Sequence, residues 1–317
     1  MKNCRLLNPN RARIYLLFTR NPLALILFEE VETYTNGDDS ALGLIVRDKT
    51  DNSFNCSILT RGKSGQFKAV KNNIDIEKIE IAKNWIDLNI SSDLLYKHED
   101  EEKFDLFDVI VSEDKIHPHF QRLDSNPGLS SAKEALKEIS YHYDDIDGNF
   151  LDQFQSINGF DARLWELFLF SLFREQQFTF DRNHEAPDYF VEKLNRKLAI
   201  EAVTIGRNQE SLKNVESFEP PSQEVVFGKL ENEMPLKFGS ALFDKMKKEY
   251  WKKEHIQGVP FVIAIADFHE GMSMTWSSSA IEKYLYGFKY EPHYDQGGNL
   301  IVKPIKINSF KKENGTE

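Results

Sequence analysis

The chain has 317 residues, of which 40% are hydrophobic and 12% aromatic. This is enough apolar material for one large or two smaller domains, and it excludes a wholly disordered protein. The 40 basic and 51 acidic side chains give a net charge of −11, which excludes binding to nucleic acid through overall positive charge. Such binding would require a local basic patch or metal ions held by carboxylates.

Two cysteines, Cys4 and Cys56, are too few for a disulfide framework or a thiolate zinc site. His117 and His119 have no evident third ligand, so they do not indicate zinc either. The longest apolar run, 23–28, has the length of a strand, and the first residues lack the apolar segment of a signal peptide. We therefore expect a cytoplasmic protein with no membrane partner.

The N-terminal part of the chain is predicted to be a β-rich domain over 1–115. Apolar segments separated by turn signals predict strands at 13–18, 23–28, 42–47, 53–59 and 66–70. Strands at this spacing are typical of a small antiparallel sheet, which we interpret as a possible binding module. The remainder is expected to be partly helical over 75–97, with a solvated acidic run at 98–108.

A linker and a helix are predicted over 116–144. The segment 118–130 is rich in turn-forming residues and is typical of a linker. Ser130 and Ser131 then provide N-cap candidates for a helix around 132–143.

From 145 to 317 the pattern alternates between helices and strands. Phe160–Phe173 is the most apolar helix candidate in the chain. The elements predicted after it are strands at 177–183, 188–193 and 198–205, a helix at 238–253, a buried strand at 260–266, a helix at 277–286 and a strand at 300–307.

Three acidic residues lie where burial is expected. Glu166 is in the middle of the apolar helix, Asp188 opens a strand directly after Pro187, and Glu201 interrupts an apolar strand. Burying an unpaired carboxylate costs on the order of several kcal/mol, so each needs a cation, a hydrogen-bonding partner or access to solvent. A divalent cation such as Mg²⁺ or Mn²⁺ would satisfy all three. Asp188 and Glu201 are expected to be neighbours, because a turn joins their antiparallel strands.

This order of elements, with Pro187-Asp188 and Glu201-Ala202-Val203, resembles the PD-(D/E)XK nuclease superfamily over roughly residues 145–290. The resemblance implies an α/β fold, α+β for the whole chain, with a restriction-endonuclease-like αβββαβ core. It implies that Glu166, Asp188 and Glu201 are catalytic residues that bind Mg²⁺ or Mn²⁺. It further implies an endonuclease that hydrolyses phosphodiester bonds, with DNA favoured over RNA, in repair, restriction or defence.

The chain departs from the superfamily pattern at Val203, where a lysine normally helps to position the attacking water. Lys245, on the predicted helix 238–253, is the best-placed catalytic replacement, because it lies beside the apolar stripe of that helix. That stripe consists of Leu242, Phe243, Met246 and Tyr250. If no lysine reaches Glu201, the alternative is a catalytically inactive nuclease-fold subunit that binds nucleic acid or takes part in assembly. An enzyme acting on another acidic substrate is a third interpretation.

Several charged residues near these acids are candidates for binding nucleic acid. Arg163 either contacts phosphate or neutralises the acids, while Lys247 and Lys248 belong either to a phosphate-binding patch or to a solvated helix face. Asp161 is expected to be a carboxylate at the N-terminus of its helix, or to join the metal ligands. Beyond nucleic acid, a homodimer or a protein partner through the N-terminal domain is also expected.

Overall fold

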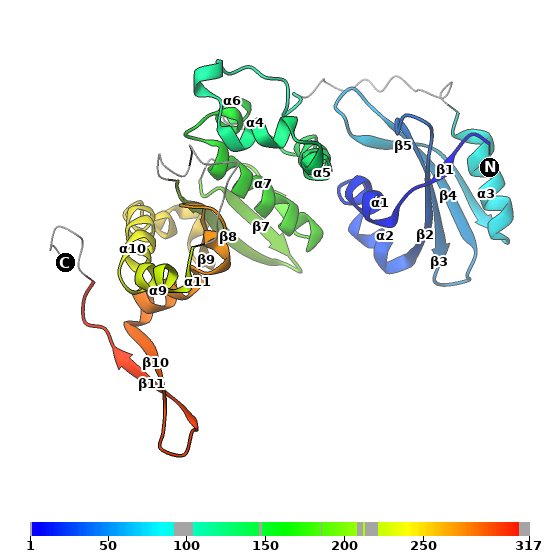
Figure 1. Ribbon diagram of the computed structural model, residues 1–317. Coiled ribbons are helices and arrows are strands. Elements are labelled where there is room, and N and C mark those ends of the chain that lie inside the picture. The colour runs from blue at the N-terminus through cyan, green and yellow to red at the C-terminus, as the bar shows by residue number, and fades with distance from the viewer. Residues whose placement is uncertain are drawn as a thin grey trace. The chain divides into compact units, whose positions relative to one another are not determined.

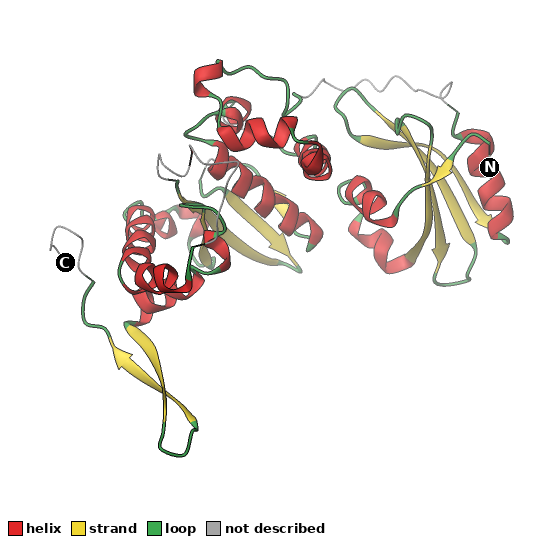
Figure 2. Cartoon of the chain, viewed as in Figure 1, coloured by secondary structure: helices red, strands yellow, loops and turns green. Residues whose placement is uncertain are grey.

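The computed structural model describes residues 2–91, 104–145, 148–184, 186–207, 212 and 221–310. These residues form a mixed α/β protein with two compact units (Figures 1 and 2). Unit 1 comprises Met1–Ile110, Leu123–Leu151 and Leu167–Phe178, and unit 2 comprises Val111–Arg122, Asp152–Glu166 and Thr179–Glu317. The division differs from the predicted boundaries at 115 and 144, because the chain contributes several separate segments to each unit.

Unit 1 is built around a five-stranded antiparallel sheet in the order β1-β2-β3-β4-β5. The strands are β1 Arg5–Leu6, β2 Phe28–Thr35, β3 Ala41–Asp48, β4 Phe54–Arg61 and β5 Phe67–Ile76. The predicted strands at 42–47, 53–59 and 66–70 correspond to β3, β4 and β5.

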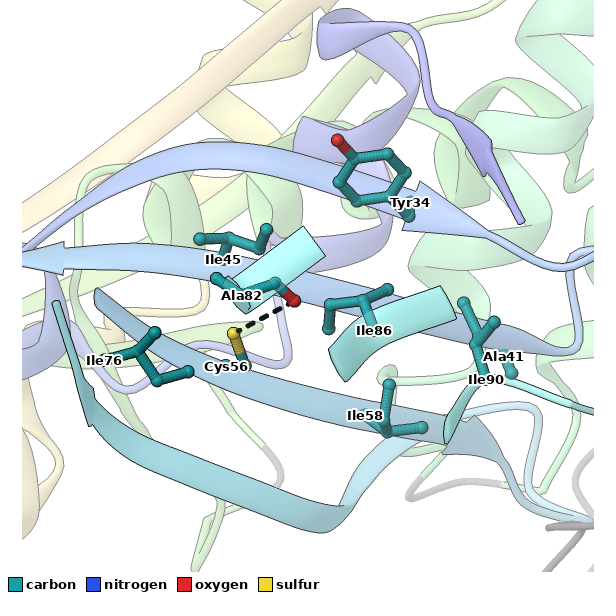
Figure 3. Packing of buried hydrophobic residues seen from close by; sticks show 9 residues of the cluster. All are labelled: Tyr34, Ala41, Ile45, Cys56, Ile58, Ile76, Ala82, Ile86 and Ile90. Atoms are coloured by element: carbon teal, nitrogen blue, oxygen red, sulfur yellow. Dashed lines mark hydrogen bonds between the residues drawn. The ribbon is translucent and has the colours of Figure 1, made fainter. Parts of the chain in front are cut away.

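Both faces of this sheet are covered. Helix α3 Ile79–Asn89 packs on one face, where Ile45, Ile58 and Ile86 are fully buried (Figure 3). Helix α1 Pro9–Leu16 packs on the other face, against the opposite side chains of the same strands. The sheet therefore has an apolar layer on each side, which is the usual arrangement of a domain core.

Two predicted strands of the N-terminal part are wrong. The segment 13–18 lies largely in α1, and 23–28 lies largely in α2 Pro22–Leu27. The start of α1 is stabilised by Asn8, whose side chain accepts a hydrogen bond from the Asn10 backbone. These apolar runs are short enough to suit either a strand or a helix, and here the cap favours the helix.

The predicted linker is also wrong, because most of it is helical. It contains α4 Pro118–Ser125 and the 3₁₀ turn Pro127–Leu129, which leads directly into α5 Ser130–Ser140. Helix α6 Phe150–Gln155 and helix α7 Phe160–Glu175 follow. Of the acidic run at 98–108, residues 98–103 lie outside the described residues.

Unit 2 contains a four-stranded sheet in the order β6-β7-β8-β9. Its strands are β6 Thr179–Asp181, β7 Tyr189–Lys193, β8 Arg196–Ile205 and β9 Phe261–Asp267. The first three are antiparallel, whereas β9 runs parallel to β8 after the crossover helices α9 Gln223–Glu231 and α10 Glu233–Met246. The predicted order of helix, three strands, helix and strand is present, with α9 as an addition.

The helices of unit 2 cover opposite faces of this sheet. Helices α9, α10 and α11 Ser278–Tyr286 pack against Ile205, which lies on the same side of β8 as Glu201. The first part of α7, residues 160–166, meets the other side, where the Tyr189 hydroxyl donates to the Glu166 carbonyl at 2.6 Å. Trp165 makes a second hydrogen bond between this helix and the sheet, because its Nε1 donates to the Ala264 carbonyl oxygen of β9.

The last two strands form a separate antiparallel hairpin, β10 Phe288–Tyr294 and β11 Leu300–Lys306. Only β11 was predicted. The described part of the chain contains no helix that is both long and apolar enough to cross a membrane.

Candidate active site

The β7–β8 hairpin brings Asp188 and Glu201 together. Tyr189 is paired with Ile200, so the next position along places Asp188 opposite Glu201 on the same face of the sheet. The Asp188 carboxylate accepts a hydrogen bond from the Ala202 backbone N–H at 2.7 Å. The predicted proximity of the two acids therefore follows from the register of the strands.

Glu201 is only 3% exposed, and Lys245 is its cationic partner. The Lys245 Nζ atom lies 2.6 Å from Glu201 Oε1, although the lysine side chain comes from α10, 44 residues further along the chain. The prediction that Lys245 reaches the sheet face of Glu201 is confirmed.

Lys245 points to the sheet because it continues the buried stripe of α10. Met234 and Phe238 lie on that stripe, and steps of three or four residues from Phe238 through Ala241 lead to Lys245. The predicted apolar stripe was wrong in part, since Phe243 and Met246 are 57% and 51% exposed.

Position 203, where the resemblance implies a lysine, holds an apolar side chain. Val203 is 5% exposed and lies on the same face of β8 as Glu201. This face packs against the helices that follow β8, and α10 supplies the ammonium group that position 203 lacks.

Tyr250 is a further member of the site that sequence reasoning missed. The predicted helix 238–253 ends at Met246, and Tyr250 begins a separate 3₁₀ turn, Tyr250–Lys252. Its hydroxyl lies close to Glu201, and burial together with the Glu201 charge raises the pKa of Tyr250 to about 12. Glu201 therefore has a cationic donor and a neutral hydroxyl beside it.

The pKa of Asp188 is raised above its ordinary value. Burial is the largest cause, followed by the negative charges of Glu201 and Glu166, and the Ala202 N–H and Lys245 oppose the shift only in part. Burial and the two neighbouring acids therefore outweigh the Ala202 N–H and Lys245 at the Asp188 carboxyl.

Glu166 lies near these acids but is directed elsewhere. Its carboxylate forms a 2.7 Å ion pair with Arg163, which also donates to Gln153. Arg163 therefore neutralises an acid, which was one of its two predicted roles. Within the described ranges, no group of three or more His, Cys, Asp and Glu side chains is arranged to hold a metal ion, so the predicted three-carboxylate set is not formed. The physical reason is that Glu166 is on α7, the helix that packs on the opposite face of the sheet from Glu201.

Asp161 has a structural partner in place of a metal. It forms a 2.9 Å ion pair with Arg207, and both side chains are largely buried. Lys247 and Lys248, the predicted nucleic-acid-binding residues, are exposed just beyond the end of α10. Glu249, four residues after Lys245, does not pair with that lysine, because it pairs with Lys252 at 2.7 Å.

Two histidines form a stack at the entry to β7. The rings of His184 and His255 lie 3.8 Å apart and nearly parallel, and His255 Nε2 is 2.9 Å from the Ala186 carbonyl oxygen. This contact fixes the segment immediately before Asp188 against the turns that follow α10.

Comparisons of the chain with protein-family models, with curated proteins and with solved structures find no match. The arrangement itself consists of two opposed carboxylates, a lysine ammonium group and a tyrosine hydroxyl on one sheet face. All-oxygen acidic donors suit a hard divalent cation, and Mg²⁺ is commonly held by one or two carboxylates together with water and phosphate.

Proposed function

We propose that this protein is a metal-dependent nuclease of the PD-(D/E)XK type, which hydrolyses phosphodiester bonds, with DNA as the favoured substrate. The observation that carries the proposal is the contact between Lys245 and Glu201 beside Asp188. It restores to the site the cation that is missing at Val203.

Asp188 and Glu201 are the residues that would hold Mg²⁺ or Mn²⁺. They fit such an ion because both present carboxylate oxygens and because a bound cation would offset the burial and the neighbouring Glu201 and Glu166 charges that raise the pKa of Asp188. When bound, the cation supplies charge neutralisation at the phosphate and makes an attacking water more acidic.

The residues of the chain would divide the remaining work. Lys245 would hold the water and the negative charge that develops on the phosphate, as a positioned cation does in phosphoryl chemistry. Tyr250 and Lys245 together would fix the orientation of the Glu201 carboxylate. Arg163 would hold the Glu166 carboxylate in an ion pair close to Asp188 without making it a ligand.

A cleavage assay tests this proposal. Purified protein is incubated with single- and double-stranded DNA and with RNA, in Mg²⁺, in Mn²⁺ and in a chelator. We expect metal-dependent cleavage that is abolished by Glu201→Gln and reduced about 100-fold or more by Lys245→Met.

Matched controls come from acids and lysines outside the site. Glu231→Gln alters a surface acid that pairs with Lys283, and Lys237→Met alters a lysine of α10 that pairs with Glu233. Both are expected to cleave as the unmodified protein does. Absence of any cleavage that depends on Glu201 would favour the catalytically inactive binding subunit.

A further inference from the structure

The β10–β11 hairpin presents one face made almost entirely of apolar side chains. The strand pairing places eight side chains on this face, namely Phe288, Tyr290, Pro292, Tyr294, Leu300, Val302, Pro304 and Lys306. Tyr290 and Tyr294 are 69% and 73% exposed, and Val302 is 50% exposed. We call these eight residues the hairpin face.

A two-stranded hairpin is marginally stable in water by itself. Its contacts with the rest of unit 2 are concentrated at its base, where Lys289 pairs with Glu231 at 3.1 Å and Gly287 accepts a hydrogen bond from Ile307 N–H. Beyond this base the hairpin extends away from the helices of unit 2 (Figure 1). An exposed apolar patch of this kind marks an interaction site.

We propose that the hairpin face is the contact between two copies of this chain. Three features favour a second copy as the occupant: the edges of the hairpin, the charge of the face and its area.

The edges of the hairpin are protected against strand addition. Pro292 and Pro304 lie within paired strands, and a proline has no N–H, so each occupies a position whose donor would point outward. Each outer edge therefore lacks a donor near its middle. A partner consequently meets the face of the hairpin and does not extend its sheet.

The charge of the face disfavours nucleic acid. Lys306 is its single charged residue, and it pairs with Phe288 at the base of the hairpin. Binding to a phosphate backbone uses several cations along a groove. Because the hairpin face is apolar except for Lys306, it is best buried against another apolar surface, such as the same face of a second copy.

The area is sufficient for a weak dimer. An aromatic side chain buries about 150–250 Å², so the exposed parts of Phe288, Tyr290 and Tyr294 represent about 350 Å². With the four aliphatic and proline side chains the face offers about 600 Å² per copy. Two copies would bury about 1,200 Å² in total, the lower limit for a specific interface.

Sedimentation of the full chain across micromolar concentrations tests the proposal. The unmodified chain is expected to pass from one to two copies per particle as its concentration rises. Val302→Glu places a charge on the hairpin face and is expected to keep the chain monomeric. Ile301→Glu is the matched control, since Ile301 is the adjacent β-branched residue, is 38% exposed and points to the other face.

Tyr294→Lys, near the tip of the hairpin, provides a second disrupting variant if Val302→Glu does not fold. Circular dichroism checks the fold of each variant. A chain that remains monomeric at every concentration overturns the proposal, and so does a dimer that survives both Val302→Glu and Tyr294→Lys. Binding of an oligonucleotide that Val302→Glu abolishes, in a monomeric chain, would overturn it in favour of a nucleic-acid contact.

Discussion

Glu201 lies between apolar neighbours on β8, where a distant part of the chain places the Lys245 donor and the Tyr250 hydroxyl beside it. Glu201 could be predicted as a site residue from the sequence, because a carboxylate buried in an apolar strand needs a partner. Lys245 could be predicted as that partner, since helical spacing limits which lysines of the next helix face the sheet. Tyr250 could not be predicted, because its position depends on where α10 ends.

Tyr250→Phe removes the hydroxyl beside Glu201 while keeping the ring in its apolar cluster with Phe190 and Ala199. Loss of a group that supports a metal ligand typically reduces metal affinity or activity by about 10–100-fold. The measurement is the Mg²⁺ concentration that gives half-maximal cleavage, which is expected to rise. Tyr294→Phe, on the exposed hairpin, is the control. An unchanged Mg²⁺ dependence would show that Tyr250 does not support the site.

His117 predicts how stability depends on pH. Burial, together with the nearby His119 and Arg207 charges, lowers its pKa from 6.5 to about 3. Between these pH values the unfolded chain binds a proton at this histidine that the folded chain does not bind. The free energy of unfolding therefore falls as the pH falls from about 6.5 towards 3. For one such proton the loss is about 1.4 kcal/mol per pH unit.

The variant His117→Phe keeps an aromatic ring beside Phe160, with which His117 is stacked at 4.7 Å. Denaturant unfolding at pH 7 and at pH 5 is expected to show a smaller loss of stability in this variant than in the unmodified chain. Equal losses in the two proteins would contradict the assignment of this pH dependence to His117.

At the scale of elements, the close approach of α3 to β3 depends on Gly43. A Cβ atom at this position would lie 2.4 Å from Cγ2 of Ile86, a side chain that is fully buried in the cluster of Figure 3. Gly43 therefore allows the helix to lie directly on the sheet.

Gly43→Ala is expected to destabilise unit 1 by about 1–3 kcal/mol, the usual cost of overpacking a core. Because Ile86 is the clashing side chain, the same substitution should cost less in an Ile86→Ala background. Thermal or denaturant unfolding of the four proteins in this cycle measures the difference. Additive losses of stability would mean that the cost of Gly43→Ala does not come from a clash with Ile86.

Elements with clear periodicity were the ones that sequence could predict. The apolar helix α7 and the strands β7 and β8 were found close to their observed bounds. The helices α1 and α2 were mistaken for strands because their apolar runs are short. The hairpin strand β10 was missed because it contains Pro292 and is exposed on both faces, so it lacks the signal of a half-buried strand.

At the scale of the whole molecule, the two units are each made from separate segments of sequence. Local sequence patterns do not indicate that distant segments belong to one unit. The prediction therefore divided the chain into consecutive domains. The net charge of −11 is likewise a property of the whole chain, whereas the proposed chemistry depends on one cation and two acids at a single sheet face. An acidic chain is compatible with a polyanionic substrate where divalent cations mediate the contact.

The proposed function requires Asp188 and Glu201 to hold a divalent cation together, beside Lys245. Anomalous diffraction from crystals of the protein soaked in Mn²⁺ tests this requirement. We expect a peak with oxygen atoms of both carboxylates within about 2.0–2.6 Å, and its loss in Glu201→Gln. A map in which Mn²⁺ occupies other positions, while the two carboxylates remain without it at saturating concentration, would contradict a shared metal site.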